Sequence, residues 1–418
     1  MDSFIRPAVE VVRSTAELDA LESGWGELLD AVPDHSLSRT FLYNRVAWTH
    51  LAEPRGAELA VITVRRGAEL LLIWPLHVER RRGHTTAAHL GNRSTQEYAA
   101  PLVRPGEHAA EALELATAHA TRLADVLAVY HQPEAPLPVG GRLGSLAFAS
   151  TTSSPLAVRP ADGFDAWLAT RPQKLRWEMR RNRRRLQKAG TVAFRSSDGD
   201  PAFGHRAVDW IFARKREWLV RRHKTTPWIS DGSGEVFFHE LLDGTPAGAA
   251  VRPLVVGVTL DDELISASVC YRSGRALEGF VMAFDESRAS LGAGNVLIEE
   301  CVRLAFDLGL DFDFRIDAFD YKLRWADRGT THHTRFVPCT VRGLAPVAAR
   351  HATRAYAELK RASTPLLTRY VPGVLSARAR HEPPRRVAAA LVQDVRARLL
   401  SPRSGDAAAP PPAAKPSG

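Results

Sequence analysis

The fold is decided by FVMAFDESRASLGAGNVLIEECVRLAFDLGLDFDFRIDAFDYKLRW, the stretch from Phe280 to Trp325. A β-rich run at its start leads into a loop that contains Gly292 and Gly294. An amphipathic helical pattern follows from about Asn295 to Leu308, and the strand-like run DFDFRI comes directly after it. This order of strand, glycine loop, helix and strand predicts an α/β unit whose loop lies at the N-terminal end of the helix.

The loop in this stretch has the features of an anion site. The first turn of a helix carries unpaired backbone N–H groups and the positive end of the helix dipole, which together suit a pyrophosphate. An arginine at the start of the loop could add a charge-assisted contact. The residues expected to hold the anion are Arg288, Leu291, Gly292, Ala293, Gly294 and Asn295. Glycines before a helix are also typical of plain turns, so the local pattern leaves both interpretations open.

Both halves of the chain show the same order of elements. In the first half, helices precede the hairpin ELAVITVRRGAELLLIWPLHVERR, and a helix from about His108 to Leu123 and the strand DVLAVYH follow. In the second half, helices from about Gln173 to Lys188 and from about His205 to Arg222 precede three strands and the glycine loop. One α/β module used twice is therefore expected.

The composition predicts how these modules divide the chain. The chain has 418 residues, more than one hydrophobic core usually supports. Two domains are expected over residues 1–155 and 160–343, because the glycine-, serine- and proline-bearing run between them is typical of a boundary. Helical patterns predict an extension over 344–400, and the alanine- and proline-rich end predicts a disordered tail over 401–418.

Composition also limits the class of protein. Hydrophobic residues make up 45% of the chain and charged residues 25%, which is typical of a globular protein. The N-terminus lacks the pattern of a signal peptide, and the most apolar run, Leu70 to Val78, is too short to span a bilayer, so a cytoplasmic location is expected. The three cysteines are widely spaced and form no C-x-x-C pair, so neither a disulfide framework nor a metal site is predicted. A net charge of +9 favours an anionic partner.

Much of this charge lies on one predicted helix, QKLRWEMRRNRRRLQKAG, from Gln173 to Gly190. Leu175, Met179 and Leu186 fall on one stripe, with Asn182 between them, so the helix should dock by that face. The rest of its surface presents Arg180, Arg181, Arg183, Arg184 and Arg185, of which we expect Arg181 and Arg184 to bind an anion. A CoA phosphate, an acidic acceptor or RNA would suit this surface, and a merely solvated helix is the alternative.

Two of these stretches resemble a known family. Three strands, an arginine- and glycine-bearing loop, a helix and a strand are similar in order to the acyl-CoA-binding core of the GNAT acetyltransferases. The segments Gln173–Gly190 and Phe312–Trp325 resemble the bacterial family that includes the cellulose-biosynthesis acetyltransferases, itself related to the Fem-type peptidyltransferases with duplicated domains. The resemblance covers most of Leu18 to Val341. It implies an α/β fold with a mixed sheet, in two tandem GNAT-type domains, and acyl-CoA bound by the second.

The resemblance also implies roles for residues near the C-terminal end of that core. The family's strand ending in aspartate, tight turn and Tyr-Lys pair correspond here to Asp313, Tyr321 and Lys322. Tyr321 is a sensible acid for a departing thiolate, although a tyrosine at a strand end can also simply pack. Asp317 and Asp313 are candidate bases or helix caps. Lys322 is expected to be a solvated cation that could meet an anionic substrate.

One departure from the family concerns the turn between Asp313 and Tyr321. The family commonly has an Arg-Gly pair before an acidic residue, whereas this chain reads Arg315-Ile316-Asp317. Without this glycine the turn could adopt a conformation different from the family's. The role that the family comparison gives to Asp317 depends on that conformation.

The acceptor side of the site is predicted from nearby polar and aromatic residues. Trp228 follows Pro227 in a predicted loop and could wall the acceptor site, with His223 and Asp231 near enough in sequence to assist. In the first domain, the family comparison would place Asn92, Gln96, Glu97 and Tyr98 towards the cleft between the domains. Ordinary loop polarity explains this last group equally well.

These features together predict an acyltransferase that moves an acyl group, with acetyl favoured, from acyl-CoA to an amine or a sugar hydroxyl. The acceptor would be a small molecule or a saccharide, and the first domain, without an evident pyrophosphate loop, would shape its cleft. An aminoacyl-tRNA-dependent transferase is the enzymatic alternative, supported by the Fem-like duplication and the basic helix. An RNA-binding protein without activity is the other, although no RNA-recognition motif is visible.

Overall fold

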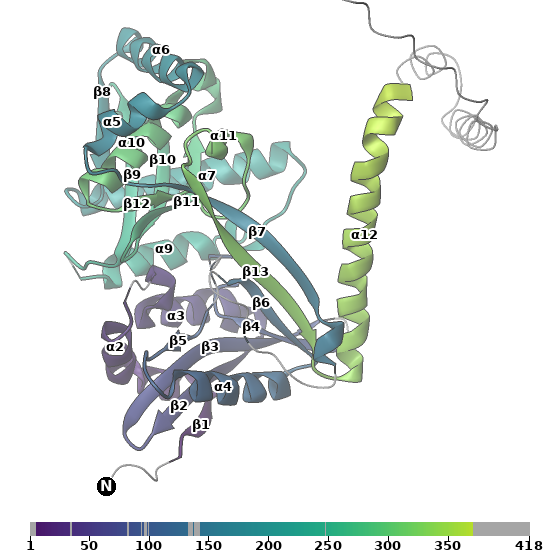
Figure 1. Cartoon of the computed structure of the whole chain (residues 1–418). Helices are drawn as coiled ribbons and strands as arrows, with labels where there is room; N and C mark the ends of the chain where they lie inside the picture. The colour runs from purple at the N-terminus through teal and green to yellow at the C-terminus, as the bar shows by residue number, and fades with distance from the viewer. Residues whose placement is uncertain are drawn as a thin grey trace, which may run out of the picture. The chain divides into compact units, whose positions relative to one another are not determined.

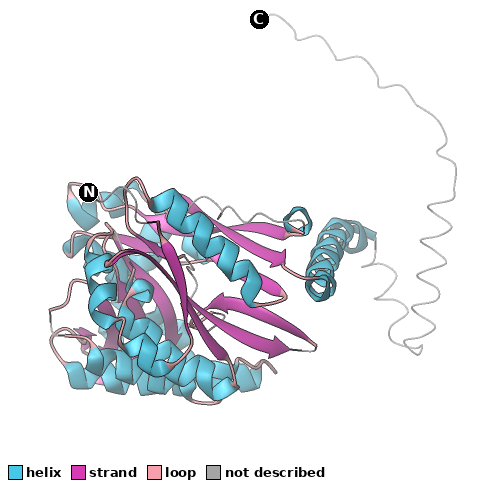
Figure 2. Cartoon of the chain, turned by 90° about the horizontal axis from the view of Figure 1, so that it is seen from below, coloured by secondary structure: helices cyan, strands magenta, loops and turns pink. Residues whose placement is uncertain are grey.

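The computed structural model describes residues 6–33, 36–81, 83–92, 94–95, 98, 100–132, 137, 143–246 and 248–370. One compact unit ends at Ala349, and a second begins at Arg350. Within the first unit the chain forms a mixed α/β structure around one continuous sheet, which confirms the predicted fold class. Figure 1 shows its helices and strands by label, and Figure 2 shows helices lying against the faces of the sheet.

The first half of the chain contains short helices followed by a mostly antiparallel group of strands, in which β4 and β6 pair in parallel. Its elements are β1 (Ala8–Val12), α1 (Thr15–Asp19), α2 (Glu22–Asp30), η1 (Leu37–Arg39), α3 (Phe41–Ala47), η2 (Trp48–Ala52), η3 (Glu53–Arg55), β2 (Glu58–Arg66), β3 (Glu69–Arg81), β4 (His84–His89), β5 (Leu102–Val103), α4 (Ala109–Leu123), β6 (Val126–Gln132), η4 (Gly144–Leu146) and β7 (Phe148–Ala157).

The second half repeats this order. Its elements are α5 (Gly163–Thr170), α6 (Gln173–Ala189), β8 (Val192–Ser196), α7 (Pro201–Arg221), α8 (Pro227–Ser230), α9 (Ser233–Gly244), β9 (Arg252–Leu260), β10 (Glu263–Arg272), β11 (Ala276–Phe284), η5 (Glu286–Leu291), α10 (Ala293–Asp307), β12 (Asp311–Asp313), α11 (Asp320–Leu323), β13 (Arg328–Pro338) and α12 (Val341–Tyr370).

The two halves exchange their last strands. The sheet runs β1-β2-β3-β4-β6-β13-β7-β12-β11-β10-β9-β8, with β5 paired to β3. Thus β13 of the second half pairs with β6 of the first, and β7 of the first pairs with β12 of the second. Figure 1 shows β7 and β13 side by side as long antiparallel strands between the halves. Because each half completes the sheet of the other, the two modules are joined by main-chain hydrogen bonds.

A shared hydrophobic core also joins the halves. Alternate residues of a strand point to opposite faces, so each face of the sheet has its own helices. In the second half, residues such as Val256 and Leu277 face α5, α6 and α10, whereas Val255 and Val281 face α7 and α9. The latter cluster continues into α2 and α3 of the first half. Tyr43 of α3 packs edge-on against Phe237 of α9, with ring centroids 5.2 Å apart.

The remaining expectations on organisation have different outcomes. The predicted boundary near residue 155 falls within β7, and the division into domains stays a prediction. The extension over 344–400 is described only as far as α12 extends, and the rest of it and the tail lie outside the described residues. In the part of the chain that the structure describes, no helix is both long and apolar enough to cross a bilayer.

Candidate active site

A cleft of about 780 Å³ lies in the second half, between the C-terminal part of α7 and the N-terminal end of α10. The end of β11 and the following η5 form its floor and rim. Its lining residues on the α10 side include Gly292, Ala293, Gly294 and Asn295. Four of the six residues predicted to hold a pyrophosphate therefore line one cleft.

The N-terminal end of α10 offers free backbone donors to this cleft. Gly292 is the N-cap, with φ of 77°, a left-handed conformation that glycine adopts at no steric cost. The N–H of Asn295 already donates to the carbonyl of Gly292 at 3.0 Å. The N–H groups of Ala293 and Gly294 have no hydrogen-bond partner within the described residues. Two unpaired donors and the helix dipole fit a phosphate group at this point.

The other two predicted loop residues lie elsewhere. The guanidinium of Arg288 pairs with Glu263 at 2.5 Å and lies 3.7 Å from Asp285, and the residue does not line the cleft. Leu291 packs on the hydrophobic cluster under α10. A contact of Arg288 with phosphate would require it to leave Glu263, and its role stays a prediction.

The two glycines of the loop are expected to respond differently to substitution by valine. A Cβ atom at Gly292 would lie 2.5 Å from Cγ of Asn182, a buried residue of α6, and the positive φ adds strain. A Cβ atom at Gly294 would lie 3.4 Å from the ring of Phe284, an ordinary contact. We expect Gly292→Val to lower the free energy of unfolding by about 1–3 kcal/mol and Gly294→Val to change it much less. Denaturant titration of both variants checks this, and equal stability would contradict it.

A second, smaller pocket of about 90 Å³ continues from the cleft into the sheet. Parallel pairing of β11 with β12 ends at Glu278 and Asp313, and the strands diverge beyond that point. The pocket is lined by residues that follow these two, including Phe280 on β11 and Phe314 after β12. Met282, Ile298 and Tyr321 line both the pocket and the cleft. The divergence of the two strands thus opens a recess at the end of the cleft.

Tyr321 lies where the cleft meets this recess. It belongs to the short helix α11, is 42% exposed, and its ring stacks on that of Phe319. Burial, and after it the negative charge of Asp317, raises the pKa of the Tyr321 phenol. The phenol therefore keeps its proton at neutral pH, as a general acid must.

The turn before α11 adopts its conformation without the family's glycine. Positive φ angles occur at Arg315 (57°) and Asp317 (72°), and Ile316 between them is not among the residues with positive φ. No glycine is therefore needed at position 316. Asp317 itself is exposed.

The structure corrects the expectation for Lys322. Its side chain is buried, and Nζ donates to the carbonyls of Phe314 at 2.8 Å, Ile316 at 2.7 Å and Arg315 at 3.4 Å. The prediction that Lys322 is a solvated cation is therefore wrong, because its ammonium group binds the turn after β12. The carbonyls that it binds follow the end of β12, and buried backbone carbonyls need hydrogen-bond partners.

The structure also places Trp228 differently from the expectation. The residue lies in α8 and is buried in the core, against Phe212 and Phe280. It lines neither the cleft nor the recess. His223 is exposed after α7, and Asp231 binds Arg55 and the first turn of α9. Neither residue therefore assists Trp228 in forming an acceptor site.

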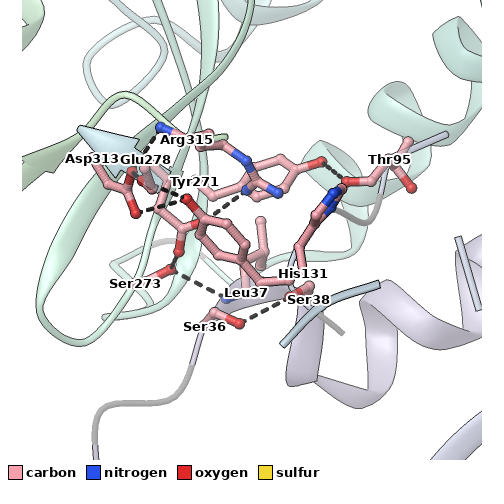
Figure 3. A network of polar contacts seen from close by, with 12 residues as sticks. Ser36, Leu37, Ser38, Thr95, His131, Tyr271, Ser273, Glu278, Asp313 and Arg315 are labelled. Carbon is pink, nitrogen blue, oxygen red and sulfur yellow. Dashed lines mark hydrogen bonds and ion pairs between the residues drawn. The ribbon is translucent and has the colours of Figure 1, made fainter. Parts of the chain in front are cut away.

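Asp313 takes part in a buried polar network at the junction of the halves, which Figure 3 shows. Its carboxylate accepts hydrogen bonds from Ser154 of β7, from the Tyr98 hydroxyl at 2.9 Å and from the backbone N–H of Arg315 at 2.6 Å. Asp313 lines neither the cleft nor the recess. Its carboxylate is thus already engaged in joining the two halves, and a role as base stays a prediction.

Arg315 is the centre of the same network. Its guanidinium pairs with Glu278 at 2.6 Å, and both side chains are almost fully buried. Glu278 also accepts from Ser273, whose hydroxyl receives the N–H of Leu37 from the first half. The guanidinium lies 4.6 Å from the ring centre of Tyr98, which also comes from the first half. Of the other first-half candidates, Asn92 does not line the cleft, and Gln96 and Glu97 lie outside the described residues.

The basic helix α6 docks by the predicted stripe, because Leu175, Met179, Asn182 and Leu186 are its buried residues. Part of its charge is neutralised by the neighbouring α10, whose Glu299 and Glu300 pair with Arg183. Arg185 donates to the carbonyl of Ser290 in η5 at 3.1 Å. Arg181 stacks on the exposed Trp177, with its guanidinium 4.6 Å from the ring centre, and Arg184 is exposed. The helix thus supports the glycine loop, and Arg180 and Arg184, whose Nε atoms donate to carbonyls of the same helix, form no ion pair within the described residues.

Sequence reasoning missed the opposite wall of the cleft. Residues of α7 line it on one helical face, namely Arg214, Lys215, Glu217, Trp218, Arg221 and Arg222. Their spacing in RKREWLVRR was visible, but nothing in the pattern indicated that this face borders the glycine loop. Trp218 is only partly buried and packs against the core while it lines the cleft.

A glycine-capped helix N-terminus in a cleft, beside two diverging parallel strands, is the arrangement expected of a GNAT-type fold. The stretch 173–323 matches the family described as "Acetyltransferase (GNAT) domain". No curated protein matches the chain.

Solved structures are similar to this chain at low sequence identity. FemX is 11% identical with a TM-score of 0.50, and the match covers 78% of this chain and 96% of FemX. A tandem GNAT protein from the clavulanic acid biosynthesis pathway is 13% identical with a TM-score of 0.39, covering 80% of this chain and 99% of that one. L-PGS from Bacillus licheniformis is 11% identical with a TM-score of 0.48, covering 80% and 96%. The resemblance to cellulose-biosynthesis acetyltransferases stays a prediction.

Proposed function

We propose that the protein transfers an acyl group, with acetyl favoured, from acyl-CoA to an amine or a sugar hydroxyl. The observation that carries this proposal is the cleft, in which the free N–H groups of Ala293 and Gly294 and the phenol of Tyr321 lie along one channel. The small volume of the recess beyond Tyr321, about 90 Å³, supports a short acyl chain.

Different residues of the cleft and the recess would carry out different parts of the proposed reaction. Acyl-CoA would supply an activated thioester carbonyl. The first turn of α10 binds phosphate oxygens, and the recess between β11 and β12 excludes water from the acyl group. Attack by the acceptor nitrogen or oxygen forms the new bond to the carbonyl carbon, and the carbon–sulfur bond breaks. Tyr321 gives its proton to the departing thiolate, and the acceptor's proton leaves to Asp317 or to water.

We expect CoA to stabilise the native protein. A ligand that binds only the folded state stabilises it by RT ln(1 + [L]/Kd), which is about 2.7 kcal/mol at a hundred times Kd. Thermal unfolding with and without millimolar CoA measures this shift, and Gly294→Val should reduce it, since its side chain enters the cleft. An unchanged melting temperature in millimolar CoA would count against the proposal.

The alternative is an aminoacyl-tRNA-dependent transferase, supported by the fold shared with FemX and by the exposed arginines of α6. In that case Arg181→Glu with Arg184→Glu should abolish an RNA affinity that falls steeply with salt. Filter binding of tRNA at several salt concentrations measures it. Negligible affinity of the native chain would remove this alternative, and RNA binding without any response to CoA would instead favour a binding protein.

We further propose a small-molecule or saccharide acceptor and a cytoplasmic location. The described residues contain no group of three side chains able to hold a metal ion, and the mechanism above requires none.

A further inference from the structure

The α7 wall of the cleft carries more positive charge than its neighbours neutralise. Four cationic side chains line the cleft from this helix, Arg214, Lys215, Arg221 and Arg222. Three carboxylates line the same cleft, Glu217, Asp285 and Glu286. The arrangement of these charges decides which of them remain for a ligand.

Each of the three carboxylates that line the cleft already has an ion pair or a hydrogen bond with a protein group. Glu217 binds Arg214 at 2.9 Å within α7, and Glu286 binds Arg221 at 2.8 Å across the cleft. Asp285 accepts hydrogen bonds from the N–H of Ser287 at 2.9 Å and from its hydroxyl at 2.7 Å.

Two cations remain after this pairing. The side chains of Lys215 and Arg222 have no ion pair or hydrogen bond within the described part of the chain. The Lys215 side chain lies against Trp218, with Nζ 5.9 Å from the ring centre, and burial lowers its pKa. A largely desolvated ammonium group without a counter-ion is costly, and a bound anion would offset that cost.

We propose that Lys215 and Arg222 form an anion site on the α7 wall, which binds a phosphate or carboxylate group of a ligand in the cleft. This anion site rests on the proposed function, because it lies in the cleft that we assign to acyl-CoA. It extends that function by naming the residues that bind one charged group of the ligand. The anion has two sources, a phosphate of CoA itself or an acidic acceptor. Lys215 lies in α7 and Arg222 caps its C-terminal end seven residues later, so both project to the same side of the cleft, opposite the N–H donors of α10.

The test compares the native protein with the double variant Lys215→Met/Arg222→Met by calorimetric titration. The probes are CoA, dephospho-CoA and inorganic phosphate, the last added to free and to CoA-saturated protein. Lys188→Met, an exposed lysine of α6 outside the cleft, is the matched control. Two charge-assisted contacts predict a loss of roughly tenfold to a hundredfold in affinity for the ligand that the site binds, with no loss in the control.

The pattern of losses identifies the anion. A loss for CoA but not for dephospho-CoA assigns the site to the 3′-phosphate, and an equal loss for both assigns it to the diphosphate. Unchanged CoA binding with lost phosphate binding to CoA-saturated protein assigns it to an acidic acceptor. Native affinities of the folded double variant for all three probes would overturn the proposal. If the native protein fails to bind CoA, the acyl-CoA function fails, and phosphate binding to the free protein still decides the anion site.

Discussion

Tyr321→Phe is expected to lower turnover roughly a hundredfold to ten-thousandfold, the range for a general acid. Tyr321 lies where the cleft meets the recess, and burial together with Asp317 raises the pKa of its phenol, so the proton is present when the thiolate departs. Only the hydroxyl is removed, and the stacking on Phe319 can persist. The affinity for CoA and the melting temperature should therefore barely change.

The measurement is kcat with acetyl-CoA and an accepted amine or sugar, alongside CoA affinity by calorimetry. Tyr130→Phe, in β6 of the first half and outside the cleft, is the matched control and should retain native turnover. Near-native turnover of Tyr321→Phe with the true acceptor would make Tyr321 a packed aromatic. Asp317→Asn would then be measured next, because its carboxylate could still accept a proton from the acceptor.

The local parts of the site could be predicted because short stretches of sequence determine their structure. The glycine loop and α10 follow from a glycine pair and a helical period, and the stripe of α6 follows from four residues at helical spacing. Four of the six predicted loop residues line the cleft for the same reason, since a helix N-terminus fixes the direction of its own N–H groups.

The parts that were missed depend on contacts between distant segments. The exchange of β7 and β13 pairs residues such as Ala149 and Arg335, and no local pattern specifies such a partner. Lys322 was expected in solvent because a lysine is most often a solvated cation, whereas the carbonyls that it binds belong to a turn six to eight residues earlier. Which face of α7 borders the cleft was likewise decided by the packing of β11 and η5.

Arg315→Met is expected to lower the free energy of unfolding by about 3–5 kcal/mol, the cost of breaking a buried ion pair from one side. The variant would leave the Glu278 carboxylate buried beside Ser273 without its cation. The aromatic rings of Tyr98, Tyr271 and Phe280 surround the guanidinium, with ring centres 4.6 to 5.2 Å away, so water does not easily replace it.

Denaturant unfolding of three variants separates the lost pair from lost packing. Arg315→Met/Glu278→Gln should recover much of the stability, because it removes the orphaned charge while it keeps a similar volume. Arg195→Met breaks the exposed pair with Asp262 and should cost less than about 1 kcal/mol. If Arg315→Met were no less stable than Arg195→Met, the buried pair with Glu278 would not contribute to the stability of the fold. A stable double variant with lowered turnover would instead mean that Arg315, which also lines the recess, acts mainly on the acyl group.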